Sequence, residues 1–268
     1  MQCGPAALAT VLAASGVDIH PDILSPQLFL PERQGSLQLE LVGAVRRHGR
    51  LPYVIDPNPD ALTAELLAGR PVLVLQNLGF RSYPLYHYAV VVGILPGPEV
   101  VLRSGTELRL IMDETRFLRA WERADFWGLT ILMPGELPAR ADYDRYVKQV
   151  AAIESMGQWQ AAEKCYRAAL AQWPNQPAAL FGLGNALLMK KQYEEAEKLF
   201  QKFLAIYPDH PAALNNLAAA LLGRNYREEA LIVIDRALAV QPQQSDFIDI
   251  LHRTRQEIVD SGLDARDP

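Results

Sequence analysis

The sequence has few of the residues that build disulfides and metal sites. Its 268 residues include two cysteines, Cys3 and Cys165, and five histidines. The two cysteines fall in segments of different character, so we expect no structural disulfide between them. No pair of cysteines or histidines has the spacing of metal ligands, and Cys3 has no second thiol near it for redox exchange. The sequence therefore argues against a metal, any other cofactor and a thiol redox function.

Long apolar runs and a strong charge of one sign are also missing. No run approaches the length of a membrane-spanning helix, and no secretory signal peptide is present. The 26 basic and 31 acidic residues leave a net charge of -5, which gives no reason to expect nucleic acid or an anionic membrane as a partner. Because Met1 lies only two residues before Cys3, we expect a further segment upstream. Location stays open: a targeting signal in that segment favours the periplasm or cell envelope, and the cytoplasm is the alternative.

The first segment has the features of a helix that carries a reactive thiol at its start. Pro5 suits the first turn of a helix, and Gly16 is a typical stop residue. Leu8 and Leu12, four residues apart, lie on one apolar face. A thiol at Cys3 faces free backbone N–H groups and the positive end of the helix dipole, which both favour the thiolate. Cys3 is therefore a candidate nucleophile; the alternative is a small buried residue at the start of a core helix.

The first half of the chain then changes from helical to strand patterns. Ser36, Asp60 and Asp113 are expected to cap further helices. The strongest strand pattern, at 87–94, is apolar on both faces and predicts a central strand. Helices followed by an antiparallel sheet are typical of the α+β class. The predicted strands cover residues 51–55, 71–75, 87–94, 99–103, 108–112 and 127–133.

A cysteine nucleophile needs a base, and histidine is the usual one. His87 is the candidate because it opens the most apolar strand, where its ring can point at a helix N-terminus packed on the sheet. The alternative for His87 is a core histidine with a structural hydrogen bond. The other histidines have structural interpretations, in a proline-rich loop (His20), at a helix end (His48) and in the C-terminal region (His210, His252).

Three separated segments then occur in a recognisable order. Residues 3–8 (Cys-Gly-Pro-Ala-Ala-Leu), 35–37 (Gly-Ser-Leu) and 87–92 (His-Tyr-Ala-Val-Val-Val) resemble the papain-like peptidases that remove double-glycine leaders from bacteriocins. The resemblance covers residues 1–135 and implies a bacterial cysteine peptidase of papain-like fold. It also implies that Cys3 is the nucleophile and His87 the general base.

The chain departs from these relatives at two positions. The family orients its imidazole with an aspartate after the next strand, and the matching residue here is Ser104. A serine can accept a hydrogen bond from the ring, but it cannot stabilise an imidazolium as a carboxylate does. Ser104 is predicted to complete the site, with Asn77 and Asp113 as alternative acceptors. The family's oxyanion glutamine falls upstream of Met1, so backbone N–H groups near Cys3 are expected to take its place.

The segment after residue 141 repeats itself every 34 residues. Three prolines and three alanines keep this spacing: Pro174, Pro208 and Pro242, and Ala162, Ala196 and Ala230. The pattern resembles the tetratricopeptide repeat, a helix–turn–helix unit that stacks into a solenoid. The resemblance implies a linker at 136–141, three repeats at 142–245, a capping helix and tail at 246–268, and a groove that binds a protein partner.

Two functions follow from these patterns. The first is a cysteine peptidase that cleaves a peptide or an exported protein, held in the cleft of residues 1–135, while the repeats bind a protein partner. The alternative is a catalytically degenerate domain that binds peptides and acts as an adaptor or scaffold. The alternative depends on the missing carboxylate and the missing upstream glutamine.

Overall fold

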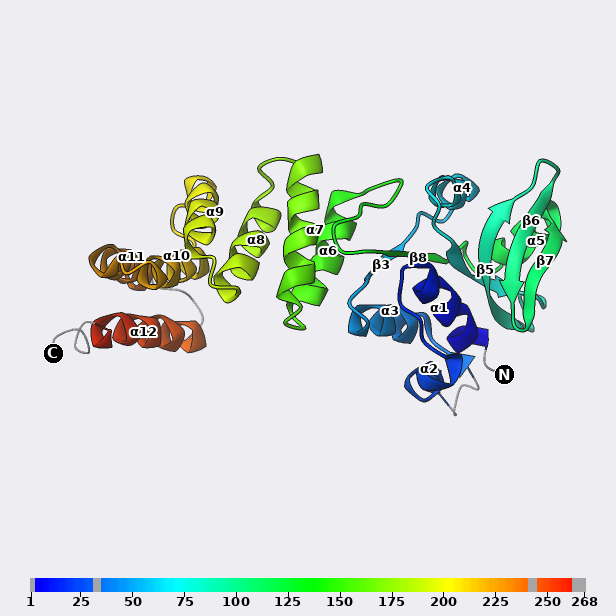
Figure 1. The fold of residues 1–268 in the computed structure, drawn as a ribbon, viewed down its shortest axis with the longest axis horizontal. Coiled ribbons are helices and arrows are strands. Elements are labelled where there is room, and N and C mark those ends of the chain that lie inside the picture. The colour runs from blue at the N-terminus through cyan, green and yellow to red at the C-terminus, as the bar shows by residue number, and fades with distance from the viewer. Residues whose placement is uncertain (1–2, 31–34, 241–244, 262–268) are drawn as a thin grey trace. The chain divides into compact units, whose positions relative to one another are not determined.

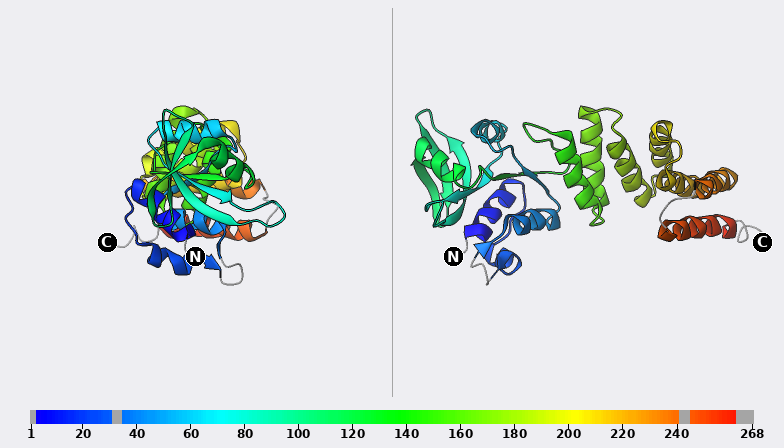
Figure 2. Two further views of the ribbon diagram at one scale, coloured as in Figure 1. Left: turned by 90° about the vertical axis from the view of Figure 1, so that its right-hand side faces the viewer. Right: turned by 180° about the vertical axis from the view of Figure 1, so that it is seen from behind.

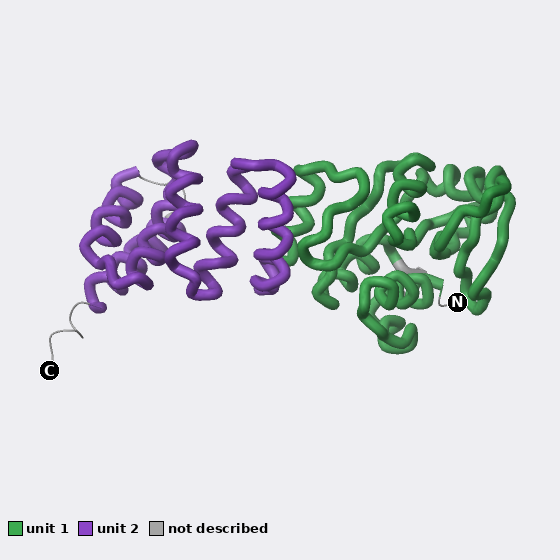
Figure 3. The backbone as a smooth tube through the Cα atoms, turned by 45° about the horizontal axis from the view of Figure 1, so that its top comes forward, with its two compact units in different colours: residues 1–153 green, residues 154–268 purple. Residues whose placement is uncertain are grey.

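A computed structural model describes residues 3–30, 35–240 and 245–261. Met1, Gln2, Pro242 and the predicted tail after residue 261 lie outside the described residues. The chain divides into two compact units, residues 1–153 and residues 154–268 (Figure 3). In the part of the chain that is described, no helix has both the length and the apolar character needed to cross a membrane.

The first unit contains a six-stranded antiparallel sheet (Figure 1). Its strand order is β3-β8-β4-β5-β6-β7, and every neighbouring pair is antiparallel. A separate two-stranded ribbon pairs β1 (Phe29–Leu30) with β2 (Gly35–Ser36). The strands of the main sheet are β3 (Leu51–Val54), β4 (Val72–Asn77), β5 (Tyr86–Ile94), β6 (Glu99–Ser104), β7 (Glu107–Asp113) and β8 (Gly128–Leu132).

Helices cover this sheet on both sides of its core. The first helices pack on β4, β5 and β8 through one buried apolar cluster, which includes Leu8, Leu12, Leu73, Tyr88 and Val90. Helix α5 lies against β4, β6 and β7 (Figures 1 and 2). The helices of this unit are α1 (Cys3–Ala14), α2 (Pro21–Leu28), α3 (Gln38–Arg47), α4 (Pro59–Leu67), α5 (Glu114–Glu122) and α6 (Tyr143–Glu154). An antiparallel sheet packed with helices is the arrangement that the α+β pattern predicts.

The helix caps agree with the sequence prediction only in part. Asp113 caps α5, since its carboxylate accepts a hydrogen bond from the Arg116 N–H at 2.9 Å. Helix α4 is capped by Asn58 rather than by Asp60, because Asn58 is extended and its side chain accepts from the Ala61 N–H at 2.9 Å. The prediction for Ser36 was wrong too, because Ser36 belongs to strand β2 and α3 begins after Leu37.

The predicted linker, residues 136–141, lies within the first unit. Two buried side chains hold it there. The Tyr53 hydroxyl donates to the Arg140 carbonyl at 3.2 Å, and the Glu65 carboxylate accepts from the Ala139 N–H at 2.7 Å. Helix α6 follows and is tied to the same unit by an ion pair between Arg145 and Asp56 at 2.7 Å. The division between the units therefore falls at residue 154, at the end of the first helix of the predicted repeats.

The second unit is a series of helices, each of which contacts the next. Its helices are α7 (Trp159–Gln172), α8 (Pro177–Met189), α9 (Tyr193–Ile206), α10 (Pro211–Gly223), α11 (Arg227–Ala239) and α12 (Ser245–Asp260). Two glycines allow close approach in α8. A Cβ on Gly182 would lie 2.2 Å from the Tyr166 ring of α7, and one on Gly184 would lie 2.7 Å from the Phe200 ring of α9. Small residues at these positions let bulky rings of the neighbouring helices pack against the α8 backbone.

The 34-residue period is visible in the contacts of this unit. Glu163 forms an ion pair with Lys190, and 34 residues later Glu197 forms the same pair with Arg224. The capping helix α12 is held at its end by Arg227, whose guanidinium donates to the Ile258 and Val259 carbonyls, both at 3.0 Å. Such bonds satisfy carbonyls that a helix C-terminus leaves without partners.

Candidate functional site

Cys3 begins helix α1, as the sequence predicts. Gly4 and Pro5 follow it and are buried, so the start of the helix is fixed against the core. The Cys3 side chain is half-buried and packs against the apolar cluster of the first unit. At this position the first N–H groups of the helix have no partner within the helix and can stabilise negative charge.

His87 and Ser104 come from neighbouring strands. His87 is the second residue of β5, and Ser104 is the last residue of β6. The ring nitrogen Nε2 of His87 lies 2.7 Å from Ser104 Oγ, a hydrogen-bond distance whose donor depends on the tautomer of the ring. The His87 side chain also forms a hydrogen bond with the Cys3 thiol. Since Nε2 faces Ser104, Nδ1 is the nitrogen left for the sulfur, and the imidazole joins the two residues.

The surroundings of Cys3 change the acidity of its thiol. Burial raises the pKa, but the hydrogen bond from His87, a backbone hydrogen bond at Tyr88, the charge of His87 and a backbone hydrogen bond at Gly4 together outweigh it. The pKa of Cys3 is therefore below its ordinary value. The pKa of the neighbouring Tyr88 is raised by burial and by the negative charge that Cys3 acquires, so its hydroxyl stays neutral. A thiol of lowered pKa is the form in which cysteine acts as a nucleophile.

The two alternative acceptors are engaged elsewhere. Asn77 is buried, and its side-chain oxygen accepts from the Gly79 N–H at 3.0 Å and the Leu85 N–H at 2.9 Å. Asp113 caps α5. Ser104 is thus the residue brought to His87. The role of Asn77 in holding the chain before His87 was missed by the sequence analysis, although an asparagine two residues before a glycine is a known signal for a side-chain-stabilised turn.

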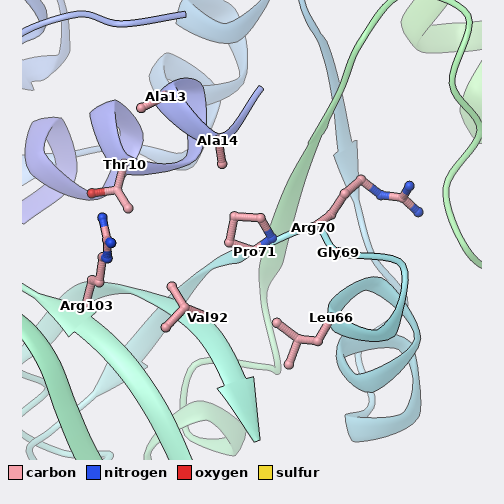
Figure 4. A pocket seen from close by; sticks show the side chains of 9 residues that line it. All are labelled: Thr10, Ala13, Ala14, Leu66, Gly69, Arg70, Pro71, Val92 and Arg103. Carbon is pink, nitrogen blue, oxygen red and sulfur yellow. The ribbon is translucent and has the colours of Figure 1, made fainter. Parts of the chain in front are cut away.

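A pocket of about 340 Å³ lies at the other end of α1 (Figure 4). It is lined by Thr10, Ala13 and Ala14 of α1, by Leu66 of α4 and by Arg103 of β6. Thr10 is about 10 Å further along the helix than Cys3 at the rise of an α-helix. The lining residues do not include Cys3, His87 or Ser104, so the pocket is separate from this site.

The remaining candidates have structural roles. Cys165 is fully buried in α7. His210 caps α10, since its Nδ1 accepts from the Ala213 N–H at 3.2 Å. Among the described residues, no cluster of three or more histidine, cysteine, aspartate or glutamate side chains could hold a metal ion.

Comparison with known proteins identifies the second unit. Two family models, both described as tetratricopeptide repeat, match residues 154–211 and residues 190–251. No curated protein matches the chain. Both family matches lie in the second unit, so the papain-like resemblance of residues 1–135 stays a prediction.

Several solved structures are similar to the chain at low identity. The Sgt2 tetratricopeptide domain from Aspergillus fumigatus is 20% identical, with 47% of this chain and 85% of that chain covered and a TM-score of 0.41. The Arabidopsis OM64 tetratricopeptide domain is 17% identical, with 43% and 93% covered and a TM-score of 0.39. The Yersinia enterocolitica type III secretion translocator chaperone SycD is 16% identical, with 46% and 86% covered and a TM-score of 0.42. On the two family matches and the 34-residue period, residues 154–251 are tetratricopeptide repeats.

Proposed function

We propose that the first unit is a cysteine peptidase of papain-like type, with Cys3 as nucleophile, His87 as general base and Ser104 as the residue that orients His87. The observation that carries this proposal is the continuous hydrogen-bonded connection from the Cys3 thiol through the His87 ring to Ser104 Oγ, the last link being 2.7 Å long. A structural core histidine does not require a thiol of lowered pKa on one side and a hydroxyl on the other.

The reaction proceeds in two halves. The Cys3 thiolate attacks the carbonyl carbon of a peptide bond, a C–S bond forms, and the carbonyl oxygen becomes an anion that backbone N–H groups at the start of α1 can stabilise. The imidazolium of His87 then gives its proton to the leaving amine, and the C–N bond breaks. In the second half, His87 takes a proton from water while the water oxygen attacks the thioester. The C–S bond breaks and releases the acid, and Cys3 returns to its starting state.

Ser104 sets the strength of this arrangement. Its hydroxyl can fix one tautomer of the His87 ring, as a carboxylate does in the resembling family, but it adds no negative charge to stabilise the imidazolium. We therefore expect slow turnover. The repeats supply a second binding surface for a protein partner, the use to which tetratricopeptide solenoids are put through their extended concave faces.

The test is covalent labelling of the full chain followed by peptide cleavage. A peptide electrophile is expected to modify Cys3 and not Cys165, and Cys3→Ala is expected to abolish both labelling and cleavage of a peptide mixture followed by mass spectrometry. Cys165→Ser is the matched control and should label as wild type does. Labelling at Cys165 alone would overturn the proposal.

A second function, a catalytically degenerate adaptor, is favoured by one specific observation. The repeats are a protein-binding module, and Ser104 stands where the resembling peptidases have a carboxylate. In an adaptor, Cys3→Ala leaves peptide binding undiminished and prolonged incubation yields no cleavage product. Cleavage that depends on Cys3 would exclude it.

A further inference from the structure

The loop between β4 and β5 carries a concentration of exposed apolar side chains. It spans residues 78–86 and leads directly into His87. Phe80 is 77% exposed, Tyr83 is 81% exposed and Tyr86 is 57% exposed. Leu78 and Leu85 are exposed as well. Clustered exposed apolar side chains on a folded protein mark an interaction site more often than single ones do.

This loop is held in one conformation by its own hydrogen bonds. Asn77 ties its two arms together, because the side-chain oxygen accepts from Gly79 N–H on one arm and Leu85 N–H on the other. Across the loop, Leu78 N–H donates to the Leu85 carbonyl at 2.8 Å. Arg123 anchors the base by donating twice to the Asn77 carbonyl, at 3.0 and 2.7 Å. The apolar side chains are therefore displayed by a preorganised loop, which lowers the entropic cost of binding.

A second feature of the loop is that Gly79 is required where it stands. A Cβ at this position would lie 2.4 Å from the Tyr83 carbonyl oxygen. The two arms approach too closely at this point for any other residue, and this keeps Phe80 and Tyr83 at the tip of the loop, where their backbones are joined at 3.2 Å.

The loop ends beside the nucleophile. Tyr86 and Tyr88 are two residues apart on β5, so their side chains point to the same face of the sheet, about 7 Å apart. Tyr88 lies in the cluster under α1 and interacts with Cys3 through its backbone and through the charge of the thiolate. Tyr86 therefore lies on the same face, one step beyond the helix end that carries Cys3, where it is open to solvent.

We propose that residues 78–86 form the substrate-recognition surface of this site and that they select a polypeptide segment bearing large apolar side chains. The inference rests on the proposed peptidase function for the identity of its occupant. A chain that reaches Cys3 from this side passes over Tyr86, and the tip residues Phe80 and Tyr83 extend the same apolar surface. Arg81 is the one charged residue in the loop and it is cationic, so a lysine-rich or arginine-rich segment is disfavoured.

The experiment measures binding in the full chain with Cys3→Ala, so that no turnover occurs. The probes are two fluorescent twelve-residue peptides of glycine, serine and asparagine, one with two phenylalanines and the other with serines in their place. Fluorescence anisotropy should show at least about tenfold tighter binding of the phenylalanine peptide, the scale expected when an aromatic side chain is buried. Tyr86→Ser and Phe80→Ser should each remove most of that preference.

Leu108→Ser is the matched control, because Leu108 is 73% exposed and lies on β7, away from the loop. It should leave the preference unchanged. Equal binding of the two peptides, an unchanged preference in both loop variants, or an equal loss in Leu108→Ser would each overturn the proposal. Alkylation of Cys3 by iodoacetamide in the wild-type chain reports separately on the nucleophile. An unreactive Cys3 with intact peptide preference would overturn the peptidase and leave the recognition surface standing.

Discussion

The two units of this chain use their residues in opposite ways. In the second unit, the same contact recurs at each step: an acidic residue on one helix pairs with a basic residue 27 positions later, in Glu163–Lys190 and again in Glu197–Arg224. In the first unit, each member of the candidate site occurs once. Cys3 begins a helix, and His87 and Ser104 reach it from two strands of a sheet.

This difference has a consequence for how each unit tolerates change. Repeats contact mainly their neighbours, so their stability is close to a sum of local terms and one lost contact removes one term. The candidate site is a linked set in which each group acts through the next, and removal of one member disables the others. Single substitutions should therefore produce loss of reactivity in the first unit and graded loss of stability in the second.

The largest effect is expected for His87→Ala. The substitution removes the hydrogen bond and the charge that lower the pKa of the Cys3 thiol and leaves burial, which raises it. The thiolate fraction of Cys3 at pH 7 should fall by roughly two orders of magnitude. The measurement is the rate of iodoacetamide alkylation of Cys3 between pH 5 and 10, with the midpoint moving to higher pH in the variant. His20→Ala, at an exposed histidine, is the control, and an unmoved midpoint in His87→Ala would refute the assignment.

The next effect in size is expected for Gly182→Ala in the second unit. The new methyl group would overlap the Tyr166 ring, 2.2 Å away, and overpacking of this kind costs about 1–3 kcal/mol. The free energy of unfolding, followed in urea by circular dichroism at 222 nm, should fall by that amount. Gly97→Ala serves as the control, because nothing lies within 4 Å of the added carbon. Equal stability of the two variants would show that the helices can move apart at this position.

A smaller effect is expected for Ser104. Ser104→Ala removes one hydrogen bond to His87 and should lower kcat/KM by about tenfold, the equivalent of roughly 1–1.5 kcal/mol. Ser104→Asp should raise kcat/KM, because a carboxylate stabilises the imidazolium as well as orienting the ring. Ser104→Thr keeps the hydroxyl and should retain most of the activity. Identical pH–rate profiles for all three variants would show that Ser104 does not act through His87.

The architecture of both units could be predicted from local patterns. The strand prediction at 87–94 corresponds to β5, and the 34-residue period identifies the repeats that the family models match. The pairing of β3 with β8 could not be predicted, because it joins residues 51–54 with 129–132 and no local pattern specifies so distant a partner. The cap of α4 could have been found, since Asn58 precedes a proline at the first helical position.

The site divides in the same way. A helix-start pattern and an apolar strand pattern were sufficient to select Cys3 and His87, because each signal is contained in a short segment. The choice of Ser104 over Asn77 and Asp113 depended on a resemblance, since the residue that meets His87 is determined by the register of β5 and β6. That register has an irregularity between Val91 and Gly93, which spacing along the sequence does not reveal.

The smallest predicted effect lies at a turn of the repeats. Lys191 has a φ of 59°, in the left-handed region, and the positions 34 residues before and after it hold Gly157 with a φ of 74° and Asn225 with a φ of 64°. A lysine in this conformation costs about 1–2 kcal/mol relative to glycine. The greater freedom of glycine in the unfolded chain returns about 0.4–1 kcal/mol of that. Lys191→Gly should therefore raise the free energy of unfolding of the full chain by about 0.5 kcal/mol, measured in urea.

The control for this prediction is Lys202→Gly. Lys202 is exposed inside α9, where φ is helical, and a glycine there should lower the free energy of unfolding by about 1 kcal/mol. The two substitutions are chemically identical and differ only in the backbone conformation that receives them. Opposite signs would show that the turn between the helices of a repeat requires a left-handed residue and that Lys191 fills this position at a cost. If both variants are destabilised alike, the turn can adopt another conformation, and the repeats are less uniform than their 34-residue period indicates.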